Sequence, residues 1–236
     1  MTPNPVIVAL DVASAEDALR LARLVAPAVG GFKIGLGLLM GPGPGVTKAI
    51  ASLGRPVFVD AKLHDIPSTV SRASEQLGRL GVRWVTAHGM GGAAMLEAAV
   101  AGLQAGSRAA EAGVLAVTVL TSSSRAGLSE VGIQGTTGTQ TARLAKLAGA
   151  TGCEGVVCPG LELGVVAAAA PELLRVVPGI RPPGVDVDDQ IQVMSPAEAV
   201  ARGADLIVVG RPIISAPDPR AAAESIAEQA LSRWGT

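Results

Sequence analysis

The sequence predicts an α/β fold, a single (β/α)₈ barrel that forms one domain over residues 1–236. Short β-branched runs alternate with Ala- and Leu-rich segments at helical spacing, and eight segments of each kind can be counted. No linker, charge block or repeat divides the chain. An open doubly wound sheet usually has fewer strands, and Asp11-Val12-Ala13-Ser14 stands where its glycine fingerprint would follow the first strand.

The β-branched runs predict strands at Val6–Leu10, Gly31–Ile34, Val57–Leu63, Trp84–Ala87, Leu115–Leu120, Gly155–Cys158, Leu174–Val177 and Leu206–Val209. The helical spacing predicts helices at Ser14–Ala26, Gly45–Leu53, Ile66–Leu80, Gly91–Ala105, Thr137–Ala150, Gly160–Ala169, Ser195–Arg202 and Asp218–Arg233. Ser14, followed three residues later by Asp17, is typical of a helix N-cap and its acidic first turn. Gly81 is a typical stop after Leu80.

The composition favours a small-molecule ligand. The formal net charge is −1, and the aromatic residues are two Phe and two Trp, so the basic stripe or stacking rings of a nucleic-acid surface are missing. Residues 1–10 lack the basic start of a signal peptide, and no apolar run approaches the ~20 residues that span a bilayer. We therefore expect a cytoplasmic protein that binds neither nucleic acid nor membrane.

Two cysteines, Cys153 and Cys158, accompany two histidines. A four-ligand zinc site of Cys and His would have to use all of these side chains. We expect buried structural thiols and no metal.

Charged residues follow several of the predicted strands. Asp11 ends the first strand, Lys33 lies near the end of the second, and Asp60 and Lys62 belong to the third. Because the strands of such a barrel end at one rim, where the reacting groups lie, we expect these charges to meet there.

The third strand carries the most information, because side chains on a strand alternate between its two faces. Alternation predicts that Phe58, Asp60 and Lys62 share the face toward the barrel mouth, since an ion pair facing the helices would be dehydrated. A structural salt bridge is the alternative reading of a lone pair. Asp11 and Lys33 favour a functional site.

A phosphate site is predicted after the seventh and eighth strands. Arg181 and Gly210-Arg211 follow them, and loops at this place in such barrels often hold a phosphate through backbone N–H groups and arginine. A solvated Arg211 on a turn is the alternative. The long segment 179–195 is rich in Pro, Gly and Asp, which favours a lid with Gln190 as a phosphate contact.

The run from Val57 to Val70 resembles the D-x-K-x-x-D-I-x-x-T signature of orotidine 5′-phosphate decarboxylases. Similarity extends over nearly the whole chain, through Val8–Asp11, Lys33-Ile34-Gly35, Ala116–Ser122, Pro178–Pro182, Asp189-Gln190 and Val209–Ile213.

The resemblance implies decarboxylation of orotidine 5′-monophosphate without a cofactor. Lys62 would protonate C6 of the pyrimidine, and Lys33, Asp60 and Asp65 would complete the charged network. The resemblance implies a homodimer in which Asp65 and Thr69 serve the partner's site, with Ile66 as a further substrate contact. It assigns ribose contacts to Asp11 and Lys33, the base to Thr121, and the phosphate to Arg181, Gln190, Gly210 and Arg211.

Two other readings stay open at this point. A related barrel enzyme could act on a keto-sugar phosphate through an Mg²⁺-bound enediolate, which typically needs a Glu among the early strand ends, where this chain has Lys33. A non-catalytic phosphate-binding barrel would keep Arg211 and the lid, but it has no use for Asp60, Lys62 and Asp65.

Overall fold

Eight parallel strands close into a barrel in the computed structural model, which describes residues 4–108, 111–182 and 194–232. Each strand pairs with the next along the chain, and β8 pairs with β1, so the predicted fold is confirmed. The strands are β1 (Val6–Ala9), β2 (Gly31–Ile34), β3 (Val57–Leu63), β4 (Trp84–His88), β5 (Gly113–Val117), β6 (Gly155–Val157), β7 (Leu174–Val177) and β8 (Leu206–Val209).

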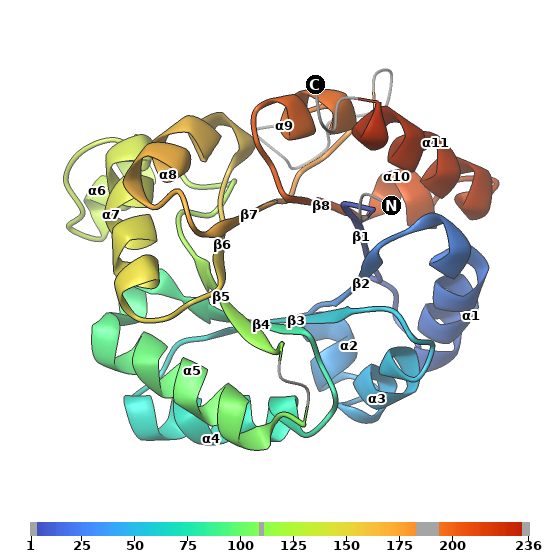
Figure 1. The fold of residues 1–236 in the computed structure, drawn as a ribbon, viewed down its shortest axis with the longest axis horizontal. Coiled ribbons are helices and arrows are strands. Elements are labelled where there is room, and N and C mark those ends of the chain that lie inside the picture. The colour runs from blue at the N-terminus through green and yellow to red at the C-terminus, as the bar shows by residue number, and fades with distance from the viewer. Residues whose placement is uncertain (1–3, 109–110, 183–193, 233–236) are drawn as a thin grey trace.

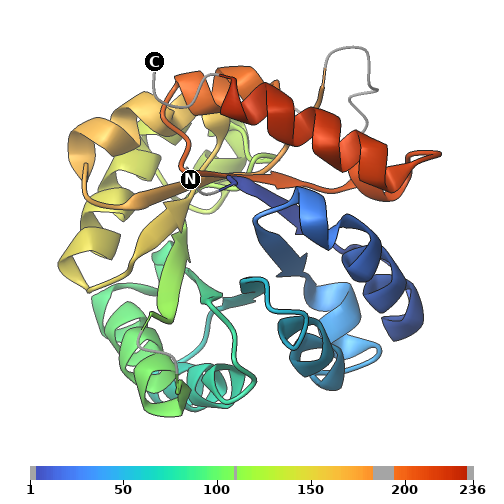
Figure 2. The ribbon, with the colours of Figure 1, turned by 45° about the vertical axis from the view of Figure 1, so that its right-hand side comes forward.

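Helices surround the strands on the outside, as both ribbon views show (Figures 1 and 2). The α-helices are α1 (Ala15–Val25), α2 (Leu36–Met40), α3 (Gly45–Ala51), α4 (Pro67–Gly78), α5 (Ala93–Gly106), α6 (Arg125–Glu130), α7 (Thr137–Ala150), α8 (Leu163–Ala169), α9 (Pro196–Ala201), α10 (Arg211–Ile214) and α11 (Pro219–Leu231). Three 3₁₀ turns are η1 (Ala26–Ala28), η2 (Gly89–Gly91) and η3 (Gly160–Glu162). The first and last helices, α1 and α11, are in contact, which closes the outer layer.

Local sequence explains where the helices begin. The hydroxyl of Ser14 accepts from the Asp17 backbone N–H at 3.0 Å, as the predicted N-cap requires. Ser195 and Glu198 form a capping box at α9. Gly81 has a φ of 77° after the end of α4, a conformation that glycine adopts without strain.

The core has two parts. A large apolar cluster fills the space between strands and helices. A smaller cluster lies inside the barrel and closes its centre, made of Ile7, Ala9, Phe58, Trp84, Leu115, Val176 and Val208. This inner layer forms the floor on which a site at the carboxyl ends of the strands can stand.

Three short helices and both ends of the fifth strand differ from the sequence prediction. Helices α2, α6 and α10 lie in segments predicted as loops, because four to six residues are too few to show a helical period. The fifth strand spans Gly113–Val117 rather than Leu115–Leu120. Val119 and Leu120 instead line a cavity, so their apolar character reflects that lining and not a strand.

Both cysteines are buried, as expected. Burial raises the pKa of the Cys153 thiol to about 11 and that of Cys158 to about 12. None of the helices in the described part of the chain has the length and apolar character that a bilayer crossing requires.

Candidate active site

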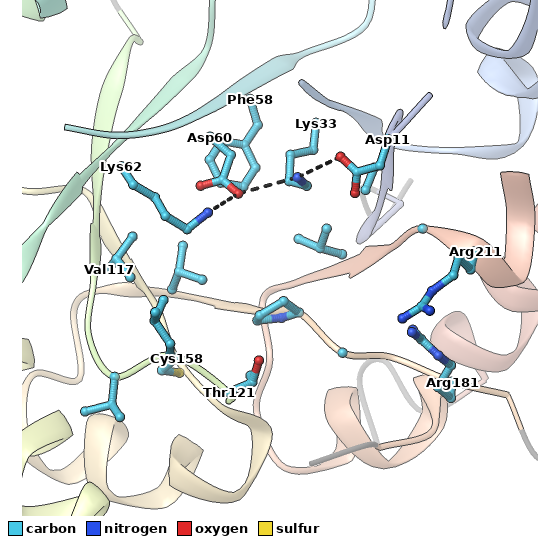
Figure 3. Close-up of a pocket in the computed structure, with 18 of the residues that line it drawn as sticks. Asp11, Lys33, Phe58, Asp60, Lys62, Val117, Thr121, Cys158, Arg181 and Arg211 are labelled. Carbon is cyan, nitrogen blue, oxygen red and sulfur yellow. Dashed lines mark hydrogen bonds and ion pairs between the residues drawn. The ribbon is translucent and has the colours of Figure 1, made fainter. Parts of the chain in front are cut away.

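A cavity of about 470 Å³ opens at the carboxyl ends of the strands (Figure 3). Seven of the eight strands contribute to its lining, either directly or through the loops that follow them. Its polar lining includes Asp11, Lys33, Asp60, Lys62, Thr121, Arg181 and Arg211. The prediction that the charged residues at the strand ends lie together at one end of the barrel is therefore confirmed.

Four charged side chains from the ends of β1, β2 and β3 form a chain of alternating sign along one side of this cavity, from Lys62 at one end to Asp11 at the arginine end (Figure 3). Lys62 Nζ lies 2.7 Å from Asp60 Oδ2, and Lys33 Nζ lies 3.4 Å from the same oxygen. Lys33 Nζ is also 3.4 Å from Asp11 Oδ1. Lys33 and Asp60 are nearly buried, whereas Asp11 reaches solvent.

The carboxyl group of Asp60 is the centre of this chain. Burial opposes its ionisation, but the positive charges of Lys33 and Lys62, with hydrogen bonds from Lys62 and Thr86, outweigh it and hold the pKa below the usual value. Asp60 is therefore a carboxylate at neutral pH.

The backbone of β3 departs from regular alternation at Lys62. Val59 pairs with Val85 and Leu63 with Ala87, so four steps along β3 face two along β4. Lys62 has a φ of 47°, a left-handed conformation that costs a non-glycine residue about 1–2 kcal/mol. The prediction that Phe58, Asp60 and Lys62 face the barrel mouth is confirmed, since all three line the cavity, but regular alternation does not account for Lys62. Lys62 reaches the cavity through this bulge.

Glycine at position 35 leaves room for the charged chain. A Cβ atom there would lie 2.9 Å from Asp11 Oδ1 and 3.2 Å from Lys33 Nζ. The missing side chain allows these two groups to meet above the end of β2.

Two arginines lie at the other end of the cavity from Lys62 (Figure 3). Arg181 is buried and donates through Nη1 to the Ile180 carbonyl oxygen at 2.9 Å, while Arg211 is exposed. Gly179 turns the chain between β7 and Arg181 with a φ of 79°. Thr121 and Gly210 also line the cavity. Gln190 and most of the expected lid lie outside the described residues.

Of the predicted site residues that the structure describes, three do not line the cavity of their own chain, namely Asp65, Ile66 and Thr69. Asp65 is exposed, and its Oδ1 accepts from the Ile66 backbone N–H at 2.6 Å. Ile66 is an exposed apolar residue, with 64% of its surface accessible. Asp65 and Ile66 lie in the exposed β3–α4 connection, and Thr69 is half-buried in the first turn of α4.

Two histidines stack beside Lys62, with ring centroids of His64 and His88 5.3 Å apart and planes inclined by 16°. Burial, and then the nearby His64 and Lys62, hold the pKa of His88 below its usual value. His88 Nδ1 accepts from the Met90 backbone N–H at 3.4 Å. These surroundings therefore favour the neutral form of the His88 imidazole.

A sequence model of the family described as "Orotidine 5'-phosphate decarboxylase / HUMPS family" matches residues 4–226. The chain belongs to this family. An orotidine 5'-phosphate decarboxylase of Anaeromyxobacter sp. (strain K) is 50% identical over 220 residues, covering 93% of this chain and 95% of the relative. One from Paramagnetospirillum magneticum is 46% identical over 229 residues, covering 94% and 97%.

Solved structures of the orotidine 5'-phosphate decarboxylase / HUMPS family share the fold. The crystal structure of orotidine 5'-phosphate decarboxylase from Lactobacillus acidophilus superposes with a TM-score of 0.85 at 36% sequence identity. The match covers 96% of this chain and 99% of that one. The barrel and its rim are thus a shared architecture.

Sequence reasoning missed two residues that shape this member of the family. Thr86 is buried within β4 and bonds to both Lys62 and Asp60, and Gly35 makes room for Asp11 and Lys33. The signal for Thr86 was a hydroxyl between the apolar residues Val85 and Ala87 of a strand.

Within the described residues, no three His, Cys, Asp or Glu side chains gather as a metal site would require.

Proposed function

We propose that this protein decarboxylates orotidine 5′-monophosphate to uridine 5′-monophosphate and CO₂, the last step of de novo pyrimidine biosynthesis. One observation carries the proposal: a lysine paired with a carboxylate lies at one end of a cavity that has two arginines at its other end. The family and its relatives at 40–50% identity support the same reaction.

The chemistry explains why a lysine stands at the reacting end. When the bond between C6 and the carboxyl group breaks, CO₂ leaves and the electron pair stays on C6 in an orbital perpendicular to the ring π system. The ring cannot delocalise that pair. The Lys62 ammonium stabilises it electrostatically and then transfers its proton to C6, so that no cofactor is needed.

Asp60 and Lys33 prepare Lys62 for this role. The Asp60 carboxylate, 2.7 Å from Nζ, keeps the ammonium form favourable in a partly buried place. Lys33 offsets part of the negative charge of Asp60 and links it to Asp11. Asp11 and Lys33 also offer polar groups to the ribose hydroxyls.

The arginine end holds the phosphate in this proposal. Arg181 and Arg211 provide charge-assisted hydrogen bonds, Gly210 allows close backbone approach, and Thr121 contacts the base. Gln190 is proposed as a further phosphate contact, as the family resemblance implies. Binding energy gained far from C6 then serves to align the reacting groups, so a substrate without phosphate loses turnover as well as affinity.

The active form is proposed to be a homodimer of one-domain chains in the cytoplasm. Asp65 and Thr69 complete the site of the partner subunit, and Ile66 is a further substrate contact. Their position outside the cavity of their own chain, together with the exposed Ile66 side chain, supports this arrangement.

A direct assay tests the function. The protein is mixed with orotidine 5′-monophosphate in EDTA, and the loss of the substrate's ultraviolet absorbance is followed. The expected result is steady loss with formation of uridine 5′-monophosphate. A strict need for Mg²⁺ would favour chemistry on keto-sugar phosphates, and binding without consumption would favour a non-catalytic barrel.

A further inference from the structure

Thr86 connects the two residues at the reacting end of the cavity. It lies in β4 with no exposed surface. Its Oγ1 accepts a hydrogen bond from the Lys62 backbone N–H at 2.9 Å and donates one to Asp60 Oδ1 at 3.0 Å. One hydroxyl thus contacts the backbone of the proton donor and the side chain of its carboxylate partner.

The direction of these two hydrogen bonds is fixed. A hydroxyl has a single proton, and the Lys62 N–H can only donate, so the Thr86 proton is left for Asp60 Oδ1. Asp60 Oδ2 meanwhile receives Lys62 Nζ and Lys33 Nζ. Both oxygens of the carboxylate are engaged, which prevents its rotation.

The same hydroxyl supports the bulge in β3. Thr86 lies between Val85 and Ala87, the two β4 residues that pair across the bulge with Val59 and Leu63. Lys62, at a φ of 47°, donates its N–H to this side chain. Left-handed conformations of non-glycine residues persist where the surroundings enforce them, and Thr86 is such a constraint.

We propose that Thr86 is a positioning residue for the reaction: its hydroxyl holds Lys62 in the left-handed conformation and fixes the Asp60 carboxylate, so that Nζ is aimed at the reacting carbon. The inference rests on the proposed function. Valine at this position has nearly the same shape but no hydroxyl, and it would leave both the Lys62 N–H and Asp60 Oδ1 without this partner.

Thr86→Val and Thr86→Ser test the proposal, with kcat and KM measured on orotidine 5′-monophosphate. We expect Thr86→Val to lower kcat about ten- to a hundredfold, the usual effect of losing a hydrogen bond to a charged group. KM should change little, because Arg181 and Arg211 are untouched. Thr86→Ser, which keeps the hydroxyl, should restore most of the activity.

The pH profile gives a readout that packing alone would not move. The groups facing Asp60 are Lys33 from β2, Lys62 from β3 and Thr86 from β4. Loss of the Thr86 donor raises the pKa of Asp60, so the acidic limb of kcat should shift to higher pH in Thr86→Val and stay in place in Thr86→Ser.

Thr118→Val is the matched control. Thr118 is equally buried, and its Oγ1 donates to the Val157 carbonyl oxygen at 2.9 Å, away from the charged chain. The Thr118→Val variant should lose about as much stability as Thr86→Val and keep the kcat of the wild type. If Thr86→Val does not fold, the comparison is made on Thr86→Cys, which keeps the size and only a weak donor.

The outcomes separate the two proposals. A wild-type protein that leaves orotidine 5′-monophosphate unchanged contradicts the proposed function. A wild-type protein that consumes it, with normal kcat in Thr86→Val, contradicts the positioning role alone. Equal losses in the Val and Ser variants, or an equal loss in Thr118→Val, also overturn it.

Discussion

Ion pairs stand at both ends of the barrel, and they are built differently. At the carboxyl ends of the strands, Lys33 and Lys62 share one carboxylate and line a cavity. At the amino ends, arginines pair with carboxylates: the first pair joins the starts of β4 and β6, and the second joins β7 to the start of β8. Arg83 Nη1 lies 2.6 Å from Glu154 Oε2, and Arg175 Nε lies 3.0 Å from Asp205 Oδ2.

The two kinds of ion pair differ in whether the cation can transfer a proton. Each of these arginines contacts both oxygens of its carboxylate, and Arg83 also lies over the Trp84 ring at 4.5 Å. Arginine does not give up its proton in proteins, so these pairs join strands and nothing more. A lysine ammonium can transfer a proton. Residue type and barrel end together distinguish a reacting pair from a structural one.

In the comparison of the two barrel ends, the largest effect is expected for Asp60→Asn. The Lys33 and Lys62 cations lose their shared carboxylate, and kcat should fall by about a thousandfold or more. Asp205→Asn makes the same change in a pair at the amino ends and should keep kcat. Steady-state kinetics of both variants check this. A comparable kcat in the two would contradict the claim that only the ion pairs at the carboxyl ends take part in the reaction.

Arg83→Ala should produce the opposite pattern. It leaves the partly buried Glu154 carboxylate unpaired, so the free energy of unfolding should fall by about 1–3 kcal/mol. Turnover per folded molecule should not change. Urea unfolding together with kcat measures both quantities, and a large loss of kcat at unchanged stability would disagree with this account.

Gly35→Ala tests the room left for the charged chain. The added Cβ would press on Asp11 Oδ1 and Lys33 Nζ, so kcat/KM should fall about tenfold, the effect of a misplacement worth about 1.4 kcal/mol. Gly37→Ala, two residues on in α2, meets nothing within 4 Å and serves as the control. We expect kcat/KM to fall in Gly35→Ala and to stay at the wild-type value in Gly37→Ala.

The smallest effect concerns pH and His88. Its pKa is lowered in the folded state, so the unfolded chain binds more protons as pH falls below about 6.5, and that part of the stability is lost on acidification. His88→Phe keeps the stacked ring and removes this titration. The fall of Tm between about pH 6.5 and 5 should then be shallower than in the wild type. Parallel curves would contradict a neutral, half-buried His88 in the folded state.

The sequence was sufficient for the barrel and for most of the rim. Strand patterning located β1 to β4 and β6 to β8 to within one residue at either end, because each is a compact β-branched run with a turn beside it. Asp11, Lys33, Asp60 and Arg211 were found because strand ends of a parallel barrel share one rim.

The other features of the site depend on contacts between distant residues, which the local sequence pattern does not reveal. The left-handed Lys62 could not be foreseen, because regular alternation describes only an unbulged strand. Thr86 acquires its role from residues more than 20 positions away. Gly35 matters only because Asp11 and Lys33 meet beside it.

The central claim is that Lys62 is required for the chemistry and dispensable for the fold. Its most direct test is Lys62→Ala, with turnover of orotidine 5′-monophosphate and thermal unfolding measured on the same sample. We predict that kcat falls by at least about a thousandfold while the protein stays folded, with Tm within a few degrees of the wild type. Near-normal turnover in this variant would contradict the account.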